Sequence, residues 1–330
     1  MELIFFLILF ILIYPINKFI QNLNFLPSQT GETHQNFLGK KNVPLSGGLF
    51  ILIFIIFLYK NNIYLSISFL IFFFLGLCVD KKIIISPSKR FILQMLFIIS
   101  FVLFFNLEVT DLRNPFLSSL LENKLISYFF IIICFLVLIN GSNFIDGLNS
   151  LLIVYYILVL LSIIGLTKYH LIIFDLNYII NLTLILSVIL IFNLLNKSFL
   201  GDSGAYSISC LVGYLSINYF KTVQDLSVLF VVIILWYPAF ENLFSILRRI
   251  YKKGKVSNPD NLHFHALIYL KMKNKFSKLN ANNLSTLLVL LLSIPGFILS
   301  NLFHYQSLIL GLIIFGNVLV YLSIYYLLKK

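Results

Sequence analysis

Six acidic residues at the ends of apolar runs are the groups in this chain that could do chemistry. The chain has only 12 Asp and Glu in 330 residues, and 60% of its residues are hydrophobic. Threading the chain through a bilayer puts six acids on one side: Glu32, Asp80, Asp146, Asp202, Glu241 and Asp260. An ionisable group at a membrane is costly and is therefore a functional candidate. Carboxylates gathered at one membrane face predict a divalent cation and phosphate chemistry.

Asp202 lies between two glycines at the start of an apolar run. Gly201 and Gly204 allow backbone N–H groups to approach an anion closely. A helix N-terminus at this point would add a positive dipole that suits phosphate. The Asp202 carboxylate is a hard oxygen ligand that suits magnesium. Helix capping is the alternative interpretation, because Asp is a preferred N-cap residue.

Four polar residues recur at intervals of three: Asn140, Asn143, Asp146 and Asn149. Residues three apart are neighbours on a helix, but such a stripe turns by about 60° at each step of a straight helix. Gly141 and Gly147 make a bend or break possible there. A polar turn between two spans is the alternative, although four amides and acids at regular spacing exceed what a turn needs.

A basic segment with two histidines follows the ninth apolar run, and it holds nine Lys and Arg but one acid. His263 and His265 share a face only if the backbone there is extended or irregular. The residues proposed to hold a pyrophosphate are His263, His265, Arg248, Arg249 and Asp260. Attraction to anionic lipid is the alternative explanation of the basic charge.

Apolar runs long enough to cross a bilayer occur along the whole chain. About 20 apolar residues span the hydrocarbon core. The eleven candidate spans are 2–20, 45–59, 63–79, 91–107, 126–144, 149–166, 177–195, 204–220, 226–246, 283–302 and 307–328. We therefore expect an all-α polytopic integral membrane protein, with residues 1–330 as a single domain. Three cysteines within apolar runs indicate neither a disulfide framework nor a zinc site.

The basic residues predict an orientation. The inner segments would be 21–44, 80–90, 145–148, 196–203, 247–282 and the C-terminal lysines. Counting Lys18 at the inner end of the first span, 19 of the 24 Lys and Arg fall inside and five outside. The positive-inside rule then places the N-terminus outside and the C-terminus inside. The first run is expected to be a spanning helix, because its charges are reversed relative to a cleavable signal.

Three segments resemble the motifs of one family, in the same order. Segment 143–149 reads Asn-Phe-Ile-Asp-Gly-Leu-Asn, segment 199–204 reads Phe-Leu-Gly-Asp-Ser-Gly, and segment 260–265 reads Asp-Asn-Leu-His-Phe-His. They resemble the polyprenyl-phosphate N-acetylhexosamine-1-phosphate transferases of bacterial glycosyltransferase family 4, which include the phospho-muramoyl-pentapeptide translocase and the transferases that begin O-antigen and teichoic acid synthesis. Three further segments match in position: 44–48, 86–94 and 238–249.

The resemblance implies an enzyme of the bacterial inner (cytoplasmic) membrane. It would transfer a sugar 1-phosphate from a UDP-N-acetylhexosamine to a polyprenyl phosphate and release UMP, as the first membrane step of cell-envelope polysaccharide synthesis. It would use magnesium or manganese, at a site facing the cytoplasm. We expect membrane lipids around the protein and no nucleic-acid partner, and a homodimer is left open.

The resemblance also assigns roles. The expected catalytic residues are Asp80, Asp146, Asp202, His263 and His265, with Asp202 as the metal ligand. The expected substrate-binding residues are Asn140, Asn143, Asn149, Lys197, Arg248, Arg249, Asp260 and Lys41. Asn149 takes a place associated with the nucleotide, where many members have Asp.

One departure from the family concerns Val79 and Asp80, where two adjacent acids are usual. A register shifted by one residue would put Lys81 at the second position, so one acid is lost in either register. We expect Asp80 alone to serve the role that the family shares between two acids. Two other functions remain open: an inactive relative that binds lipid or regulates, and a secondary transporter with carboxylate ion sites.

Overall fold

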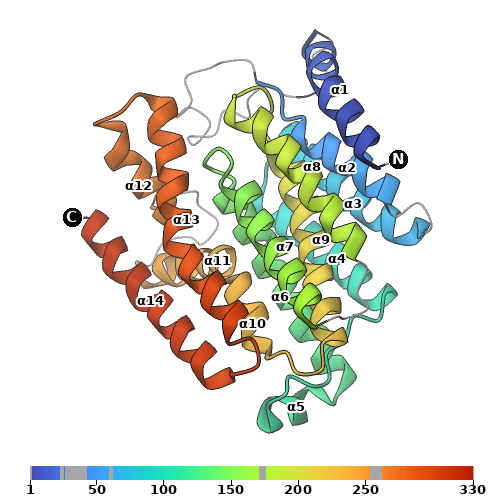
Figure 1. The fold of residues 1–330 in the computed structure, drawn as a ribbon, viewed down its shortest axis with the longest axis vertical. Coiled ribbons are helices and arrows are strands. Elements are labelled where there is room, and N and C mark those ends of the chain that lie inside the picture. Colours follow the sequence, from blue (N-terminus) through green and yellow to red (C-terminus); the bar gives the residue numbers. More distant parts are fainter. Residues whose placement is uncertain are drawn as a thin grey trace.

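The chain is all-helical in a computed structural model that describes residues 2–22, 26, 43–58, 62–170, 176–252 and 262–329, with no β-strand in these ranges (Figure 1). The helices are α1 (Glu2–Asn22), α2 (Gly47–Leu58), α3 (Ile63–Asp80), α4 (Pro87–Phe104), α5 (Pro115–Leu121), α6 (Lys124–Ile145), α7 (Leu151–His170), α8 (Leu176–Leu194), α9 (Gly201–Thr222), α10 (Val228–Ile234), α11 (Trp236–Tyr251), α12 (Phe264–Lys273), α13 (Lys278–Leu302) and α14 (Ser307–Lys329).

Helices occupy all eleven predicted spans. Within the described ranges, seven helices are long and apolar enough to cross a membrane, or eight if the bent pair α10–α11 is one span. This composition fits a multi-pass membrane protein. The number of eleven spans and the N-out, C-in orientation stay predictions.

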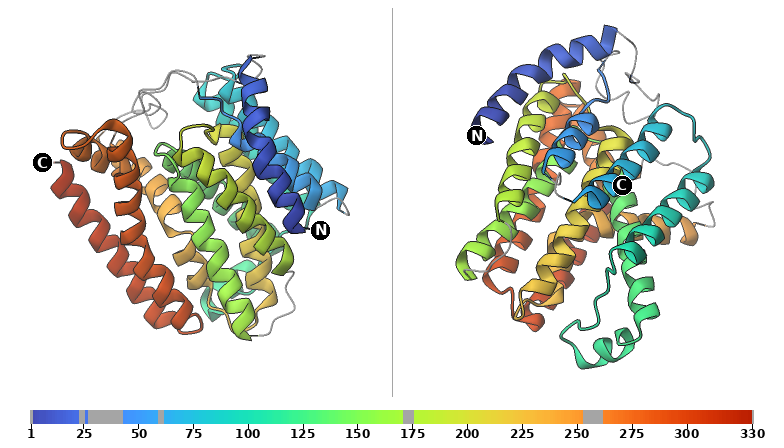
Figure 2. Two further views of the ribbon diagram at one scale, coloured as in Figure 1. Left: turned by 45° about the horizontal axis from the view of Figure 1, so that its top comes forward. Right: turned by 90° about the vertical axis from the view of Figure 1, so that its right-hand side faces the viewer.

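Helix α9 lies at the centre of the bundle and packs against α2, α3 and α6 (Figures 1 and 2). Its sequence is rich in Gly and Ser, and small residues let helix backbones approach closely. A Cβ atom at Gly76 of α3 would collide with the backbone of Ser203. The hydroxyl groups of Ser207, Ser209 and Ser216 donate to carbonyls one turn earlier, which satisfies them inside the bundle.

The predicted span 226–246 is not one straight helix. It consists of α10 and the first part of α11, which bend by 76° at Leu235. Pro238 explains the break, because proline has no N–H to bond a carbonyl one turn earlier and its ring clashes there. Helix α11 therefore runs across the bundle against α6 (Figure 1).

The C-terminal helices form one side of the molecule, opposite α1, α2 and α3 (Figures 1 and 2). Helix α12 packs on α13 and α14, and α13 packs on α7. This arrangement brings α14 beside the segment that holds His263 and His265, which we call the histidine segment, although the two lie far apart in the sequence.

Candidate active site

A pocket lies where the end of α6, the end of α8 and the start of α9 meet. It is partly open to solvent. Its lining residues are Leu45, Asn143, Asp146, Gly147, Leu148, Asn149, Asn193, Phe199, Leu200, Gly201 and Asp202. Two predicted acids from different motifs, Asp146 and Asp202, thus share one pocket, which we call the acidic pocket.

Asp80 caps helix α9 from the end of α3. Its carboxylate oxygens accept hydrogen bonds from the backbone N–H groups of Asp202 (2.9 Å) and Ser203 (3.1 Å), and its side chain is buried. Gly201 has a φ of +73°, and a Cβ there would lie 2.9 Å from an Asp80 oxygen. The carboxylate therefore satisfies two of the helix's unpaired donors and complements its dipole.

Asp202 is consequently not the cap of its own helix. The N-cap position is Leu200, whose side chain makes no capping bond, and Asp202 lies in the first turn. Its Oδ2 lies 3.4 Å from Nη1 of Arg90 and accepts from the Tyr206 hydroxyl at 3.3 Å. The Asp202 side chain stays 22% exposed, so its oxygens are accessible from the pocket.

Arg90 is a site residue that the sequence analysis did not assign. Helix α4 begins with Ser86 as the N-cap and Pro87 in the first turn, a favoured combination. This start places Arg90 one turn into the helix, opposite Asp202. The signal was the basic first turn of segment 86–94, but its partner lies 112 residues further along the chain.

Asp146 follows the last residue of α6 and is half-buried. Burial, together with the charges of Asp202 and Asp80, raises the pKa of the Asp146 carboxyl well above its usual value. Carboxylates that raise one another's pKa disfavour being ionised together unless a cation lies nearby. This pocket therefore suits a cation ligand.

No group of three His, Cys, Asp or Glu that could hold a metal occurs among the described residues. Magnesium does not need such a cage, because it is often held by one or two carboxylates together with substrate phosphates and water. Asp146 and Asp202, with Asn143 and Asn149 also among the lining residues, supply that kind of donor set.

The stripe of polar residues is broken by a turn. Helix α6 ends at Ile145 and α7 begins at Leu151, so Asn143 lies on the helix whereas Asp146 and Asn149 lie in the turn. All three line the pocket. Asn140 does not line it, and its side chain donates to the Leu136 carbonyl of its own helix at 2.9 Å.

Asn149 is held by two other segments, the turn that follows α8 and helix α13. Its Nδ2 donates to the side-chain oxygen of Asn196, and its backbone N–H donates to the Asn282 side chain at 2.9 Å. Its carbonyl accepts from the Thr286 hydroxyl at 2.8 Å. Helix α13 therefore fixes the turn that carries Asp146, a role that nothing in the motifs indicated.

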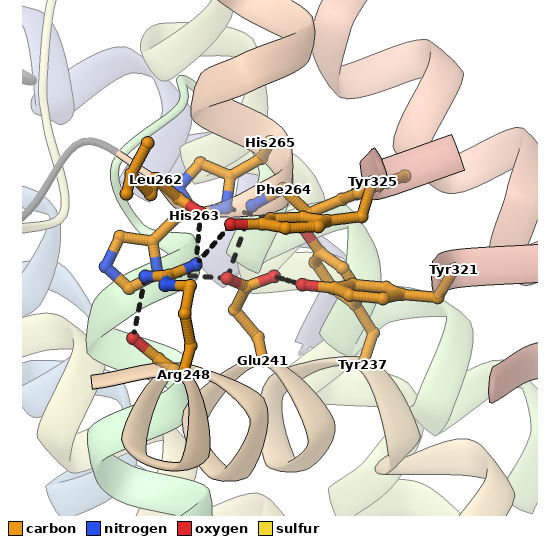
Figure 3. Close-up of polar contacts among 10 residues, drawn as sticks. Tyr237, Glu241, Arg248, Leu262, His263, Phe264, His265, Tyr321 and Tyr325 are labelled. Atoms are coloured by element: carbon orange, nitrogen blue, oxygen red, sulfur yellow. Dashed lines mark hydrogen bonds and ion pairs between the residues drawn. The ribbon is translucent and has the colours of Figure 1, made fainter. Parts of the chain in front are cut away.

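A second polar group, the histidine cluster, consists of Tyr237, Glu241, His263, His265 and Tyr321 (Figure 3). Glu241 is fully buried. Its Oε1 lies 2.9 Å from Nδ1 of His263 and accepts from the Phe264 backbone N–H at 3.3 Å, and its Oε2 accepts from the Tyr321 hydroxyl at 2.8 Å. In the sequence Glu241 is one of the six inner acids but has no assigned role, and Tyr321 carries no local signal.

The two histidine rings lie face to face, with centroids 5.6 Å apart. His263 has an extended backbone just before α12, which is the condition expected for residues two apart to share a face. His265 Nδ1 lies 3.3 Å from the Tyr237 hydroxyl. The His263 ring also packs on Phe144, with the two ring centroids 4.8 Å apart. In the sequence Phe144 lies between the pocket residues Asn143 and Asp146.

The two predicted arginines differ in their surroundings. Arg248 is buried, and its guanidinium donates to the Leu262 carbonyl, to the Tyr325 hydroxyl at 3.0 Å and to Ser245 at 3.2 Å (Figure 3). These bonds hold the end of the histidine segment. Arg249 is half-buried, with its guanidinium 5.8 Å from the Phe144 ring centroid and so beside the pocket.

Three other predicted residues lie away from this centre or cannot be placed. Lys197 is exposed, and its Nζ lies 6.0 Å from the Tyr14 ring centroid of α1. It is not among the residues that line the acidic pocket. Lys41 and Asp260 lie outside the described residues.

Comparisons with known proteins agree with the motifs. A probable undecaprenyl-phosphate N-acetylglucosaminyl 1-phosphate transferase of Bacillus subtilis is 29% identical over 241 residues, which cover 68% of this chain and 65% of that protein. A phospho-N-acetylmuramoyl-pentapeptide-transferase of Prochlorococcus marinus strain MED4 is 28% identical over 278 residues, or 75% of this chain and 76% of the relative. The corresponding protein of strain MIT 9515 is 29% identical over 282 residues, with the same coverage. The matched stretch is thus just under two thirds of the Bacillus protein.

The sequence profile of glycosyl transferase family 4 matches residues 62–220. This range contains Asp80, Arg90, Asp146 and Asp202, whereas the histidine cluster lies beyond it. The resemblance drawn from the motifs is thereby confirmed, and the matched range contains every residue that lines the acidic pocket except Leu45.

Proposed function

We propose that this protein transfers a sugar 1-phosphate from a UDP-N-acetylhexosamine to a polyprenyl phosphate. The observation that carries the proposal is the acidic pocket, in which Asp146 and Asp202 come together from separate motifs, with Arg90 beside Asp202. The named activities of the relatives support the same reaction class. All three groups lie at helix ends, unlike the mid-membrane sites typical of transporters.

The proposal includes a divalent cation, Mg²⁺ or Mn²⁺. Asp202 would hold it, with Asp146 as the second carboxylate, and the donor set of the pocket fits such an ion. When bound, the cation supplies Lewis-acid stabilisation of charge on the phosphate oxygens. Both acids have their positions fixed by other segments, Asp202 by Asp80 and the turn of Asp146 by α13.

In the reaction, an oxygen of the polyprenyl phosphate attacks the β-phosphorus of the UDP-sugar. A new P–O bond forms, the bond from the β-phosphorus to the bridging oxygen breaks, and UMP leaves with that oxygen. A phosphate monoester is largely ionised at neutral pH, since its second pKa is about 6, so the attack needs no strong base. Arg90 and Arg249 are suited to steady phosphate oxygens, because a guanidinium matches phosphate geometry.

The proposed setting is the bacterial inner membrane, with the acidic pocket on the cytoplasmic side. Ser88 and Ser119 are both exposed and fall on opposite predicted sides. Cysteine substitutions at each, in a chain without its native cysteines, should react with an impermeant reagent from inside for Ser88→Cys and from outside for Ser119→Cys. The reverse pattern would overturn the orientation and with it the location of the pocket.

The activity is tested with purified protein, polyprenyl phosphate, Mg²⁺ and a panel of UDP-N-acetylhexosamines. We expect release of UMP with at least one sugar and formation of a lipid diphosphate sugar by mass spectrometry. Absence of UMP with every sugar, from protein that remains folded, would favour an inactive relative, the alternative that Val79 suggests.

A further inference from the structure

Glu241 is a charged group in an unusual place, because it is fully buried in the bundle and has no part in the proposed reaction. A buried carboxylate is costly unless hydrogen bonds compensate it. Here both oxygens accept hydrogen bonds, from His263, from the backbone of Phe264 and from Tyr321 (Figure 3). All three donors lie on the histidine segment or on α14.

The contact between Glu241 and His263 fixes how the imidazole is oriented. Nδ1 faces the carboxylate at 2.9 Å, and Figure 3 shows the other ring nitrogen pointing away from it. The hydrogen bond at one ring nitrogen decides which tautomer a histidine adopts. A carboxylate partner requires a proton on Nδ1, so Nε2 is the nitrogen that faces away from Glu241 and carries the lone pair.

His263 also contacts the stretch of chain that carries Asn143 and Asp146 of the acidic pocket. Its ring packs on Phe144, which directly follows Asn143 and lies two residues before Asp146. The guanidinium of Arg249 lies against the same Phe144 ring. His263 and Arg249 therefore contact the same ring, and a guanidinium beside the imidazole suits contact with a diphosphate.

We propose that Glu241 is a positioning residue for His263. It holds Nδ1 so that Nε2 meets the diphosphate of the nucleotide sugar, and this role rests on the proposed function. Tyr321 holds the second oxygen of Glu241, so the C-terminal helix α14 is part of the machinery. Helix α14 lies outside the stretch that the family profile matches.

The kinetic test uses Glu241→Gln, Tyr321→Phe, His263→Ala and the double variant Glu241→Gln/His263→Ala. Glu241→Gln should lower kcat about 10- to 100-fold, the usual cost of losing the partner that orients a histidine ligand. KM for polyprenyl phosphate should change less than about threefold. In the His263→Ala background the same substitution should cost less than about twofold, because residues that act as a unit are not additive. A full additional loss in that background would overturn the proposal.

Tyr321→Phe is the milder variant if Glu241→Gln does not fold. We expect it to lower kcat roughly three- to tenfold in the otherwise unchanged protein and to have no further effect on kcat in the His263→Ala background. The matched control is Tyr128→Phe, which removes a hydroxyl bound to Asn106 at the other end of α6. The control should leave kcat unchanged. An equal loss in the control would show a general effect of removing a buried hydroxyl, and would overturn the role of Tyr321.

A readout independent of turnover is the tautomer of His263. In ¹⁵N-histidine-labelled protein, with His263 assigned by the His263→Ala spectrum, Nδ1 of the neutral imidazole should carry the proton and Nε2 should carry none. Glu241→Ala, which removes the acceptor of the Nδ1 proton, should abolish this preference. A wild-type His263 protonated on Nε2 alone would overturn the proposal, even in active protein. If UMP release fails while the Nδ1–H signal is present, the proposed reaction is wrong but Glu241 still orients His263.

Discussion

Asp202 in the acidic pocket and Glu241 in the histidine cluster are both helix carboxylates, but their surroundings differ. Asp202 keeps 22% of its side chain exposed, and Arg90 and Tyr206 contact it at 3.4 and 3.3 Å. Glu241 is fully buried and accepts hydrogen bonds at 2.8 to 3.3 Å on both oxygens. A partly solvated charge at a pocket can take a ligand, whereas a fully bonded one holds its neighbours in place.

The largest effect should come from the exposed carboxylate. Asp202→Asn keeps the size of the side chain and removes the charge that a hard cation needs. Lewis-acid stabilisation is worth several kcal/mol, so the rate of UMP release should fall at least about a thousandfold with the fold intact. The matched control is Asp111→Asn, an exposed loop acid bonded to Ser118, which should keep full activity. Normal turnover of Asp202→Asn would exclude it as the metal ligand.

The next substitution tests whether Asp80 acts on Asp202 through the backbone. Asp80→Asn replaces one acceptor oxygen by an NH₂ group that faces a backbone donor of α9. Unfolding free energy should fall by about 1–3 kcal/mol, and a displaced Asp202 should lower the rate about a hundredfold. Activity and thermal unfolding in the same detergent check both.

The control for this prediction is Asn123→Ala. Asn123 also accepts from two backbone N–H groups, of Leu125 and Ile126, at the N-terminus of α6. It should cost about 1 kcal/mol of stability and no activity. If Asp80→Asn behaved in the same way, Asp80 would be a cap without influence on the site.

A packing change in α3 should have a smaller effect. In Gly76→Ala the added methyl would collide with the Ser203 backbone, so α3 and α9 must separate. Overpacking of this kind costs about 1–3 kcal/mol, and the shift of Asp202 should lower the rate about tenfold. Gly316→Ala in α14, where no atom lies within 4 Å, should be neutral or stabilising by up to about 1 kcal/mol. Equal effects would show that the close approach is not required.

Cation binding at the acidic pocket should depend on pH. The Asp146 carboxyl has a raised pKa, so below that value it is protonated and binds the cation poorly. Mg²⁺ affinity should fall by up to about tenfold per pH unit below the raised pKa. Without the cation, the stability of the fold should change with pH in the opposite direction. A carboxyl whose pKa is raised in the folded state stabilises the fold at pH values below its usual pKa of 3.8, and this stabilisation is lost as the pH rises through the raised pKa.

Thermal unfolding with and without Mg²⁺ between pH 5 and 8 would measure this, and Asp146→Asn should remove both trends. Persistence of the trends in Asp146→Asn would assign them to another group.

The smallest effect is expected for Tyr325→Phe, which removes one of the acceptors of Arg248. Its rate should stay within about threefold, because Ser245 and the Leu262 carbonyl still hold the guanidinium.

The sequence predicted the acids of the pocket but not what positions them. Asp146 and Asp202 carried local signals, namely glycine neighbours and regular spacing. The contacts of Arg90 and Tyr321 span 112 and 80 residues and arise only when helices pack. Helices occupy all eleven spans predicted from the sequence, but α5 and α12 were not predicted, and α10 and α11 were predicted as one span. Pro238 was a readable signal for the bend between them.

The bond between Asp80 and the start of α9 has a consequence for biosynthesis. The two partners are separated by 122 residues. At roughly 5–20 residues per second, the Asp80 carboxylate would wait on the order of 6 to 24 seconds during translation before its backbone donors exist. Ribosome-stalled chains that end before residue 201 should therefore leave Asp80 open to a carboxyl-modifying reagent, and longer chains should protect it. Protection in the shorter chains would mean that another partner holds this carboxylate while the protein is being made.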